Sequence, residues 1–244
     1  ADTRVGGREI SVCKVEGQPD IRCDCRWLDL VPPQRCVNYE VISCEGVTQS
    51  AALVTADFAP AGEGSQLVVT VQLSSLAADM QAGYRQGFGA GLDTLAQVAD
   101  RTMVLQRRIM APRQVVWGAW MNPETLPRWW GPDGFSCRTK HIDLRAGGEW
   151  VFDMIAPDGT VFPNHHRYGE VRAEDRISYA LHWGENGPKH ADAWALFEEA
   201  DGATTVTLGM IFSSAAEFQE AKGFGAIELG MQTLGKLARF VGAA

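Results

Sequence analysis

An internal repeat constrains the fold of this chain more than any other feature. The pattern Asp-x-Arg-x-Gly-Gly at residues 2–7 recurs 141 residues later at 143–148. Further on, the apolar positions of 67–73 match those of 206–212 at a spacing of 139, and both alternate with a period of two, as half-buried strands do. Each copy then ends in a segment with apolar residues every three or four positions, which predicts an amphipathic helix. Two similar units are therefore expected.

The two copies are predicted to be of unequal extent. We expect a first domain over residues 1–100 and a second over 101–244. Residues 101–142, which predict a strand over 104–110 and two short helices, have no counterpart in the first copy. Truncation, processing or the choice of segment would explain this difference, and the alternative is that a partner chain supplies the missing elements.

The second copy predicts an α+β fold. Alternating apolar residues separated by turn signals indicate strands near 148–154, 163–171, 176–183, 193–198 and 204–212. The order is one strand, two short helices, a meander of about six antiparallel strands and a long helix. A curved antiparallel sheet wrapped around one amphipathic helix would bury the apolar faces of both.

Composition excludes several classes of function. The chain has 45% hydrophobic residues and a net charge of −8, which is typical of a globular protein. No block of Lys and Arg is present, so we expect no nucleic-acid partner. No apolar run is long enough to span a membrane, and residues 1–18 contain no apolar signal core, so a cytoplasmic location is expected.

The six cysteines do not form a recognisable metal or disulfide framework. No CxxC spacing occurs, and a reducing compartment would leave thiols unpaired. Cys23 and Cys25 lie on one face of a predicted strand, either as small apolar residues or as a redox or soft-metal pair, and the first interpretation is favoured. Neither a metal nor a cofactor is expected.

The order and spacing of several short motifs resemble a known family. The pattern is similar to bacterial homologues of the C-terminal domain of the heat-shock-chaperone ATPase activator, in the START-like SRPBCC superfamily with the helix-grip fold. The resemblance covers essentially all of 103–242, and the first copy matches only the later part of the pattern. The motifs are Ala111-Pro112, Val116-Trp117, Ala119-Trp120, Asn122-Pro123-Glu124, Trp129-Trp130-Gly131-Pro132, Asp143-x-Arg145-x-Gly147-Gly148-x-Trp150, Pro157-Asp158-Gly159, Pro163-Asn164-His165 and Thr233-Leu234-x-x-Leu237-Ala238.

This resemblance implies a deep apolar cavity between the sheet and the long helix. Superfamily members bind lipids, polyketides, hormones or aromatic compounds there, and some are cyclases or other enzymes. The eukaryotic namesake stimulates a chaperone ATPase by protein contact. Because one fold hosts such different activities, the function must be argued from the site.

Aromatic side chains are the first candidates for the lining of that cavity. Seven of the eight tryptophans lie in the second copy. The alternative is ordinary core packing, because large aromatic residues dominate protein cores. The candidate ligand-binding aromatic residues are Trp129, Trp130, Trp150, Phe152, Tyr168 and Trp194.

Asn164-His165-His166 is the most distinctive polar cluster. Successive strand residues point to opposite faces, so at most one histidine faces the cavity and the pair cannot bind one metal without a bulge. Asn164 and His165 are candidate ligand contacts. His165 is the candidate catalytic acid or base, since imidazole titrates near neutrality. The alternative is a rim histidine bonded to backbone.

Arg145 precedes the paired glycines of the second copy. It either clamps a ligand carboxylate or phosphate or pairs with a nearby acid such as Asp143 or Glu149. Its counterpart Arg4 in the first copy favours the structural role. No nucleophile elbow or phosphate loop is present.

Three functions remain open from the sequence. We expect a binding protein for a hydrophobic or aromatic small molecule rather than an enzyme. The second possibility is a cofactor-independent cyclase, lyase or hydrolase that uses the same cavity. The third is a chaperone-regulating interaction module, with a homodimer or another protein completing the first copy through unpaired sheet edges.

Overall fold

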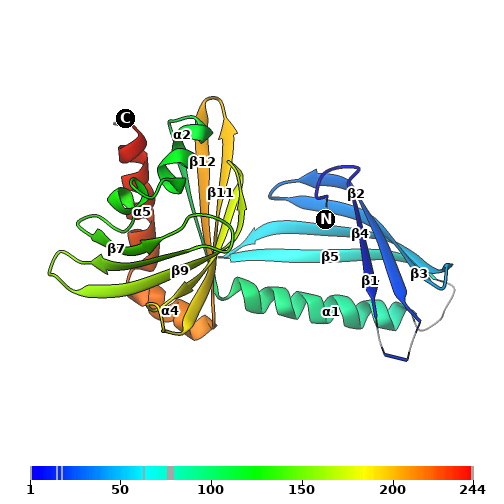
Figure 1. Ribbon diagram of the computed structural model, residues 1–244. Helices are drawn as coiled ribbons and strands as arrows, with labels where there is room; N and C mark the ends of the chain where they lie inside the picture. Colours follow the sequence, from blue (N-terminus) through cyan, green and yellow to red (C-terminus); the bar gives the residue numbers. More distant parts are fainter. Residues whose placement is uncertain (1, 15, 18, 63, 76–79, 243–244) are drawn as a thin grey trace. The chain divides into compact units, whose positions relative to one another are not determined.

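The computed structural model describes residues 2–14, 16–17, 19–62, 64–75 and 80–242. The chain divides into two compact units, Ala1–Leu92 and Asp93–Ala244. Each contains one antiparallel sheet (Figure 1). No helix among the described residues is long and apolar enough to cross a bilayer.

The first unit is built on a five-stranded meander. Its strands follow chain order across the sheet, so each hairpin partner is also the sequence neighbour. One helix follows the last strand. The elements are β1 (Arg8–Cys13), β2 (Ile21–Val31), β3 (Arg35–Cys44), β4 (Val47–Ala61), β5 (Gly64–Ser75) and α1 (Met80–Ala99).

The second unit has a seven-stranded sheet in the order β6-β12-β11-β10-β9-β8-β7. Its first strand lies at one edge beside the last, and two helices connect it to the strand at the other edge. The elements are β6 (Thr102–Ile109), α2 (Arg113–Met121), α3 (Leu126–Trp129), β7 (Ser136–Ile142), β8 (Glu149–Ile155), β9 (Val161–Arg172), β10 (Arg176–His182), β11 (Lys189–Ala200), β12 (Ala203–Phe212), α4 (Ala215–Gly223) and α5 (Ala226–Gly242).

The strand registers confirm that the units are two copies of one pattern. Arg8 pairs with Arg26 between β1 and β2, and Glu149 pairs with Arg167 between β8 and β9, each 141 residues further on. The offset changes to 139 in the later strands, as the sequence predicts, because the last two strands of each sheet pair in equivalent register. β1–β5 therefore correspond to β8–β12.

The Gly-Gly pair makes the same turn in both units. Gly6 and Gly147 adopt φ of +79° and +77°, a region that favours glycine. A Cβ on Gly148 would lie 2.3 Å from the Asp143 carbonyl oxygen, so this backbone approach also requires glycine. The turn amides donate to equivalent carbonyls in the two units. Gly6 N–H donates to the Trp27 carbonyl of β2, and Gly147 N–H donates to the Tyr168 carbonyl of β9.

The core of the second unit lies between one face of its sheet and the helices. α5 supplies the fully buried side chains Leu234 and Leu237, and α2 supplies Val116 and Trp120. We call the sheet face that contacts these helices the inner face. Its rows of alternating apolar residues are the physical reason why the sheet curves around the helix.

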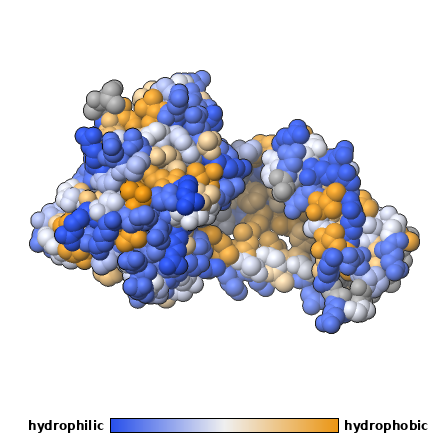
Figure 2. Space-filling model, in the orientation of Figure 1, coloured by the Kyte–Doolittle hydropathy of each residue, from blue (hydrophilic) through white to orange (hydrophobic). Residues whose placement is uncertain are grey.

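The first unit has a much smaller core. Ala52, Val54 and Tyr84 form its buried cluster, with half-buried neighbours that include Phe88. Figure 2 shows hydrophobic residues on the surface of this unit. Phe58 of β4 is 41% exposed. The strand and two helices predicted to be absent from this copy have no counterpart in its described part.

The α+β helix-grip fold is confirmed, with one local correction. The C-terminal region contains two helices, because α4 ends before Phe224-Gly225, where Gly225 has a φ of +78°. The division into domains at residues 1–100 and 101–244 stays a prediction.

Candidate functional site

Aromatic rings from neighbouring strands gather on the inner face of the second sheet. Trp150 and Phe152 project from the same side of β8 because they are two residues apart. Their rings stack with centroids 3.7 Å apart, and both side chains are fully buried. Tyr168 of β9 and Tyr179 of β10 continue the row, with centroids 5.9 Å apart.

The connecting helices close this row with three tryptophans. Trp130 packs edge to face on Trp150 at 5.9 Å and on Trp129 at 5.5 Å. Trp120 contacts both Trp129 and Trp130. The buried indole N–H of Trp129 donates to the Ala119 carbonyl, and that of Trp150 donates to Thr139 Oγ1. Trp129, Trp130 and Trp150, which the sequence predicts to line a cavity, therefore pack directly against other aromatic rings.

His166 is the histidine that joins this aromatic cluster. It pairs with Trp150 across the sheet, and its ring lies 5.0 Å from those of Phe152 and Tyr179. Burial lowers its pKa to about 3, and nearby His190 and His165 add to the shift. His166 is therefore neutral at physiological pH.

His165 lies on the opposite face from Trp150, which corrects its placement as a cavity-lining acid or base. Its Nε2 is 2.8 Å from Glu149 Oε2, and its ring is 5.7 Å from that of His182. The side chain is 1% exposed, and its Nδ1 has no hydrogen-bond partner among the described residues. A substrate in the inner space could not reach this imidazole.

Two other predicted contacts lie away from the aromatic cluster, and a third lies beside it. Trp194 is on the outer face, where its ring covers Gly209 so closely that a Cβ there would be 2.1 Å from it. Asn164 pairs with Phe152 across the sheet and so lies on the same face as the cluster, and its side-chain amide donates to the Phe162 carbonyl. Arg145 pairs with Asp143 at 2.8 Å and is 74% exposed, as the structural interpretation of this arginine predicts.

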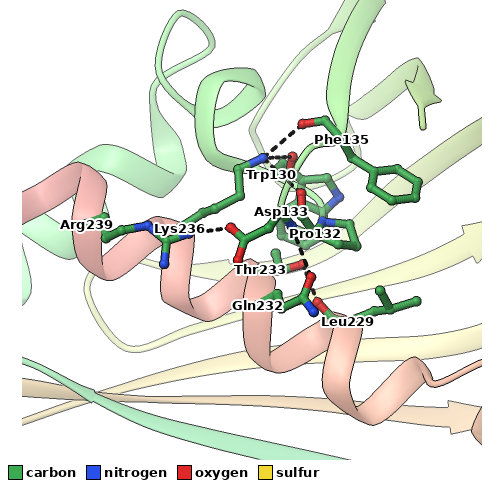
Figure 3. Close-up of polar contacts among 9 residues, drawn as sticks. All are labelled: Trp130, Pro132, Asp133, Phe135, Leu229, Gln232, Thr233, Lys236 and Arg239. Atoms are coloured by element: carbon green, nitrogen blue, oxygen red, sulfur yellow. Dashed lines mark hydrogen bonds and ion pairs between the residues drawn. The ribbon is translucent and has the colours of Figure 1, made fainter. Parts of the chain in front are cut away.

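A lysine of α5 fastens the loop that follows α3. Lys236 Nζ donates to the carbonyl oxygens of Trp130, Pro132 and Phe135, at 3.5, 3.3 and 3.0 Å (Figure 3). Arg239 forms an ion pair with Asp133 in the same loop. Burial lowers the pKa of Lys236. This network attaches the loop that contains Trp130 to α5.

Beside this network, a groove of about 460 Å³ runs between β6 and α5. Two guanidinium groups approach Gly235: a Cβ there would be in ordinary contact distance, 3.4 Å from an Arg239 nitrogen and 3.6 Å from an Arg107 nitrogen. In the part of the chain described, Arg107 forms no ion pair, whereas Arg239 does. The groove is lined by Arg107, Asp133, Ile227, Glu228, Met231, Gln232, Gly235 and Arg239.

Sequence reasoning missed this groove, although one signal pointed to it. Arg107 lies on the same face of β6 as Met103, Leu105 and Ile109, which are buried on its inner face. A charged residue in a row of inward-facing apolar positions indicates either a protected edge or a binding group. The described residues contain no cluster of three or more His, Cys, Asp or Glu suited to a metal ion.

Comparison with solved structures shows what the second unit is similar to. Protein Ms6760 from Mycobacterium smegmatis is 23% identical with a TM-score of 0.55, over 60% of this chain and 94% of that one. Protein NE0264 from Nitrosomonas europaea is 25% identical with a TM-score of 0.53, over 59% of this chain and 96% of that one. These likenesses show a shared fold.

A third structure, a protein from Arthrobacter aurescens, is 21% identical with a TM-score of 0.54, over 60% of this chain and 89% of that one. Comparison with curated proteins gives no match. The family described as Activator of Hsp90 ATPase homolog 1-like protein matches residues 110–242, which is more than half of the chain. The protein with this duplicated helix-grip pattern therefore belongs to the Activator of Hsp90 ATPase homolog 1-like family.

Proposed function

We propose that the second unit binds a small apolar molecule that carries one anionic group, in the groove between β6 and α5. The position of Arg107 beside the apolar side chains of Ile227 and Met231 in this open groove carries the proposal, because it joins a cationic group to apolar surface. The groove lies where the sheet meets the C-terminal helix. We propose the groove rather than the aromatic cluster as the binding site, because the rings of the cluster are packed against one another.

The groove offers two kinds of contact. Ile227 and Met231 present apolar surface from α5, and thioether side chains adapt to varied ligand shapes. Arg107 supplies a guanidinium that can bind a carboxylate, sulfonate or phosphate oxygen with two hydrogen bonds. The carboxylates of Asp133 and Glu228 also line the groove and favour a ligand with a single negative charge.

Anilinonaphthalene sulfonate is a suitable probe, because it joins an aromatic body to one anionic group. We expect saturable fluorescence enhancement with the full chain. Arg107→Gln should weaken binding about tenfold or more, the cost of losing a charge-assisted hydrogen bond. Arg108→Gln is the matched control: it removes the same charge from the adjacent, exposed residue of β6 and should leave affinity unchanged.

Equal affinities for both variants would contradict the proposal, because they would show that the dye binds elsewhere. Circular dichroism of each variant establishes that the fold is retained. Met231→Gln should also weaken binding, since it replaces apolar groove surface with an amide. A variant that binds the dye more strongly while losing its thermal transition would reveal unfolding rather than a site.

The other two functions have unequal support. An enzyme that uses His165 is disfavoured, because that imidazole is enclosed and faces away from the groove-side helices. We also propose an interaction role for the first unit, because large apolar side chains of its sheet, among them Phe58 and Val68, are exposed. A regulatory contact with a chaperone would be one form of that role.

A further inference from the structure

Cys23 and Cys25 of β2 lie on the face of the first sheet that α1 contacts. They are two residues apart in an extended strand, so both thiols project from the same side of it. Across the sheet, Cys25 pairs with Glu40 of β3, and Glu40 pairs with Ala52 of β4. Ala52 packs on Tyr84 of α1, so this row faces the helix. The two thiols are therefore neighbours on the α1 side of the sheet.

The surroundings of this pair are largely polar, which disfavours its interpretation as two small apolar residues. The Cys23 thiol donates to Glu40 Oε2 at 3.9 Å. Cys25 lies between two carboxylates, because Glu9 of β1 is opposite it on one side and Glu40 on the other. Three of the four cross-strand neighbours of the pair are polar, and the four are Ser11, Ile42, Glu9 and Glu40.

The spacing of the two cysteines favours an ion between the sulfurs over a disulfide. Alternate residues of a strand have Cα atoms about 6.7 Å apart, which is at the long limit for a disulfide. A metal ion that bridges two sulfurs suits the longer separation, because two metal–sulfur bonds replace one sulfur–sulfur bond. The equivalent positions of the second unit hold Asn164 and His166, so the dithiol is a feature of the first unit.

The number of ligands selects the kind of ion. Zinc takes four ligands in structural sites, and the described residues contain no group of three or more His, Cys, Asp or Glu that could hold a metal ion. Cu(I) prefers soft sulfur ligands and accepts linear coordination by two of them. A pair of neighbouring thiols without a third ligand therefore fits Cu(I) rather than zinc.

We propose that Cys23 and Cys25 bind one Cu(I) ion through their two sulfurs. The ion forms two copper–sulfur bonds and displaces two thiol protons, which pass to the solvent, and no electron is transferred. The bound complex of one Cu(I) and two thiolates carries a single negative charge. This inference concerns the first unit and rests neither on the groove of the second unit nor on the interaction role proposed above.

Proton release gives the site a characteristic pH dependence. Burial raises the pKa of Cys23, and the Glu40 carboxylate adds to the shift. Burial and the neighbouring Cys23 raise the pKa of Cys25 to about 11, so both thiols are protonated near neutral pH. Because the ion displaces both protons, its affinity should rise about 100-fold per pH unit between pH 6 and 8, against about tenfold for a site with one thiol.

Transfer of Cu(I) from its bicinchoninate complex to the reduced full chain tests the site, because the colour of the complex fades as the ion leaves. We expect the chain to take up one ion with high affinity. Cys23→Ser and Cys25→Ser should each weaken this binding about 100-fold or more, since the ion loses one of two sulfurs held on the same strand. Zn(II) in excess should not compete.

The other cysteines of the first unit supply matched controls. Cys36→Ser removes a half-buried thiol of β3 that lies between Leu30 and Ala56, and it should leave the affinity unchanged. Cys13→Ser and Cys44→Ser remove thiols that both lie opposite Ile21, and they should also bind as the wild type does. Circular dichroism establishes that each variant is folded.

Three results would overturn the inference. The first is a wild-type chain that withdraws no Cu(I) from the bicinchoninate complex. The second is a folded Cys23→Ser or Cys25→Ser variant that binds as tightly as the wild type. The third is an equal loss in the Cys36→Ser, Cys13→Ser or Cys44→Ser variant, because other thiols would then hold the ion. Dye binding in the groove should be the same for wild type and Cys23→Ser, which separates this inference from the ligand proposal.

Discussion

The two units share a strand register and differ in what fills the inner face. At equivalent positions of β1 and β8, the first unit has Glu9 where the second has Trp150. Cys25 of β2 likewise stands where β9 carries His166. The second unit adds α2 and α3 over its aromatic row, and the first shows no such helices in its described residues.

The two units therefore show that the strand topology of this fold can form with cores of very different size. The Gly-Gly turn and the hairpins fix the order and register of the strands in both units. The aromatic residues and connecting helices supply the buried area that stabilises one of them. Substitutions at equivalent positions of the two units test this separation.

Trp150→Ala should be the most destabilising change. Removing a fully buried indole that stacks on Phe152 should cost about 3–5 kcal/mol of unfolding free energy. The matched change Glu9→Ala in the first unit should fall within about 0.5 kcal/mol of wild type, because Glu9 is exposed. Denaturant unfolding followed by circular dichroism reports both units, and similar effects of the two changes would contradict this difference.

Lys236→Met should have the next largest effect. It leaves three loop carbonyls without their ammonium donor and should cost about 2 kcal/mol, while Met keeps the apolar stem. Gln97 of α1, 139 residues earlier, is exposed, so Gln97→Met is the control and should be nearly neutral. A neutral Lys236→Met would show that the loop is held by its other contacts.

His166 should give the second unit a pH-dependent stability. Its folded pKa of about 3 lies below the ordinary value of 6.5, so the unfolded chain binds the proton first and stability falls as pH drops below 6.5. At pH 5 the loss should be about 1–2 kcal/mol. Cys25, at the equivalent position of the first unit, has its pKa raised to about 11 by burial and stays protonated over this range.

His166→Phe should reduce this dependence by about half, because it keeps a ring in the cluster and removes one of two titrations. His190, whose pKa burial lowers to about 4, should leave a residual slope of similar size, because its folded pKa also lies below pH 5. The measurement is unfolding free energy by denaturant at pH 7, 6 and 5. An unchanged slope in His166→Phe would assign the dependence to other groups.

The sequence predicted most of the fold and less of the site. Alternation in β8 placed Trp150 and Phe152 on one face, and adjacency placed His165 and His166 on opposite faces. Which histidine faces the helices depends on the register with β8 and on bulges nearby, which no single strand encodes. For this reason the sequence alone does not distinguish His165 from His166, and it is His166 that lies in the cluster.

The groove and the Lys236 contacts both form between segments that are far apart in the sequence. The groove forms because Arg107 of β6 lies close to Arg239 of α5, and both guanidinium groups approach Gly235. Lys236 has an ordinary helical context in sequence, and its role comes from three carbonyls of a loop about one hundred residues earlier. Local patterns carry no information about such contacts.

By itself, the sequence determined the duplication, the strand order and the turn glycines, because these follow from periodicity and from backbone conformations that only certain residues adopt. The tertiary structure alone decided which residues line the groove and which histidine is buried among aromatic rings. These depend on the packing of segments far apart in the chain, where distance and burial rather than residue type set the chemistry.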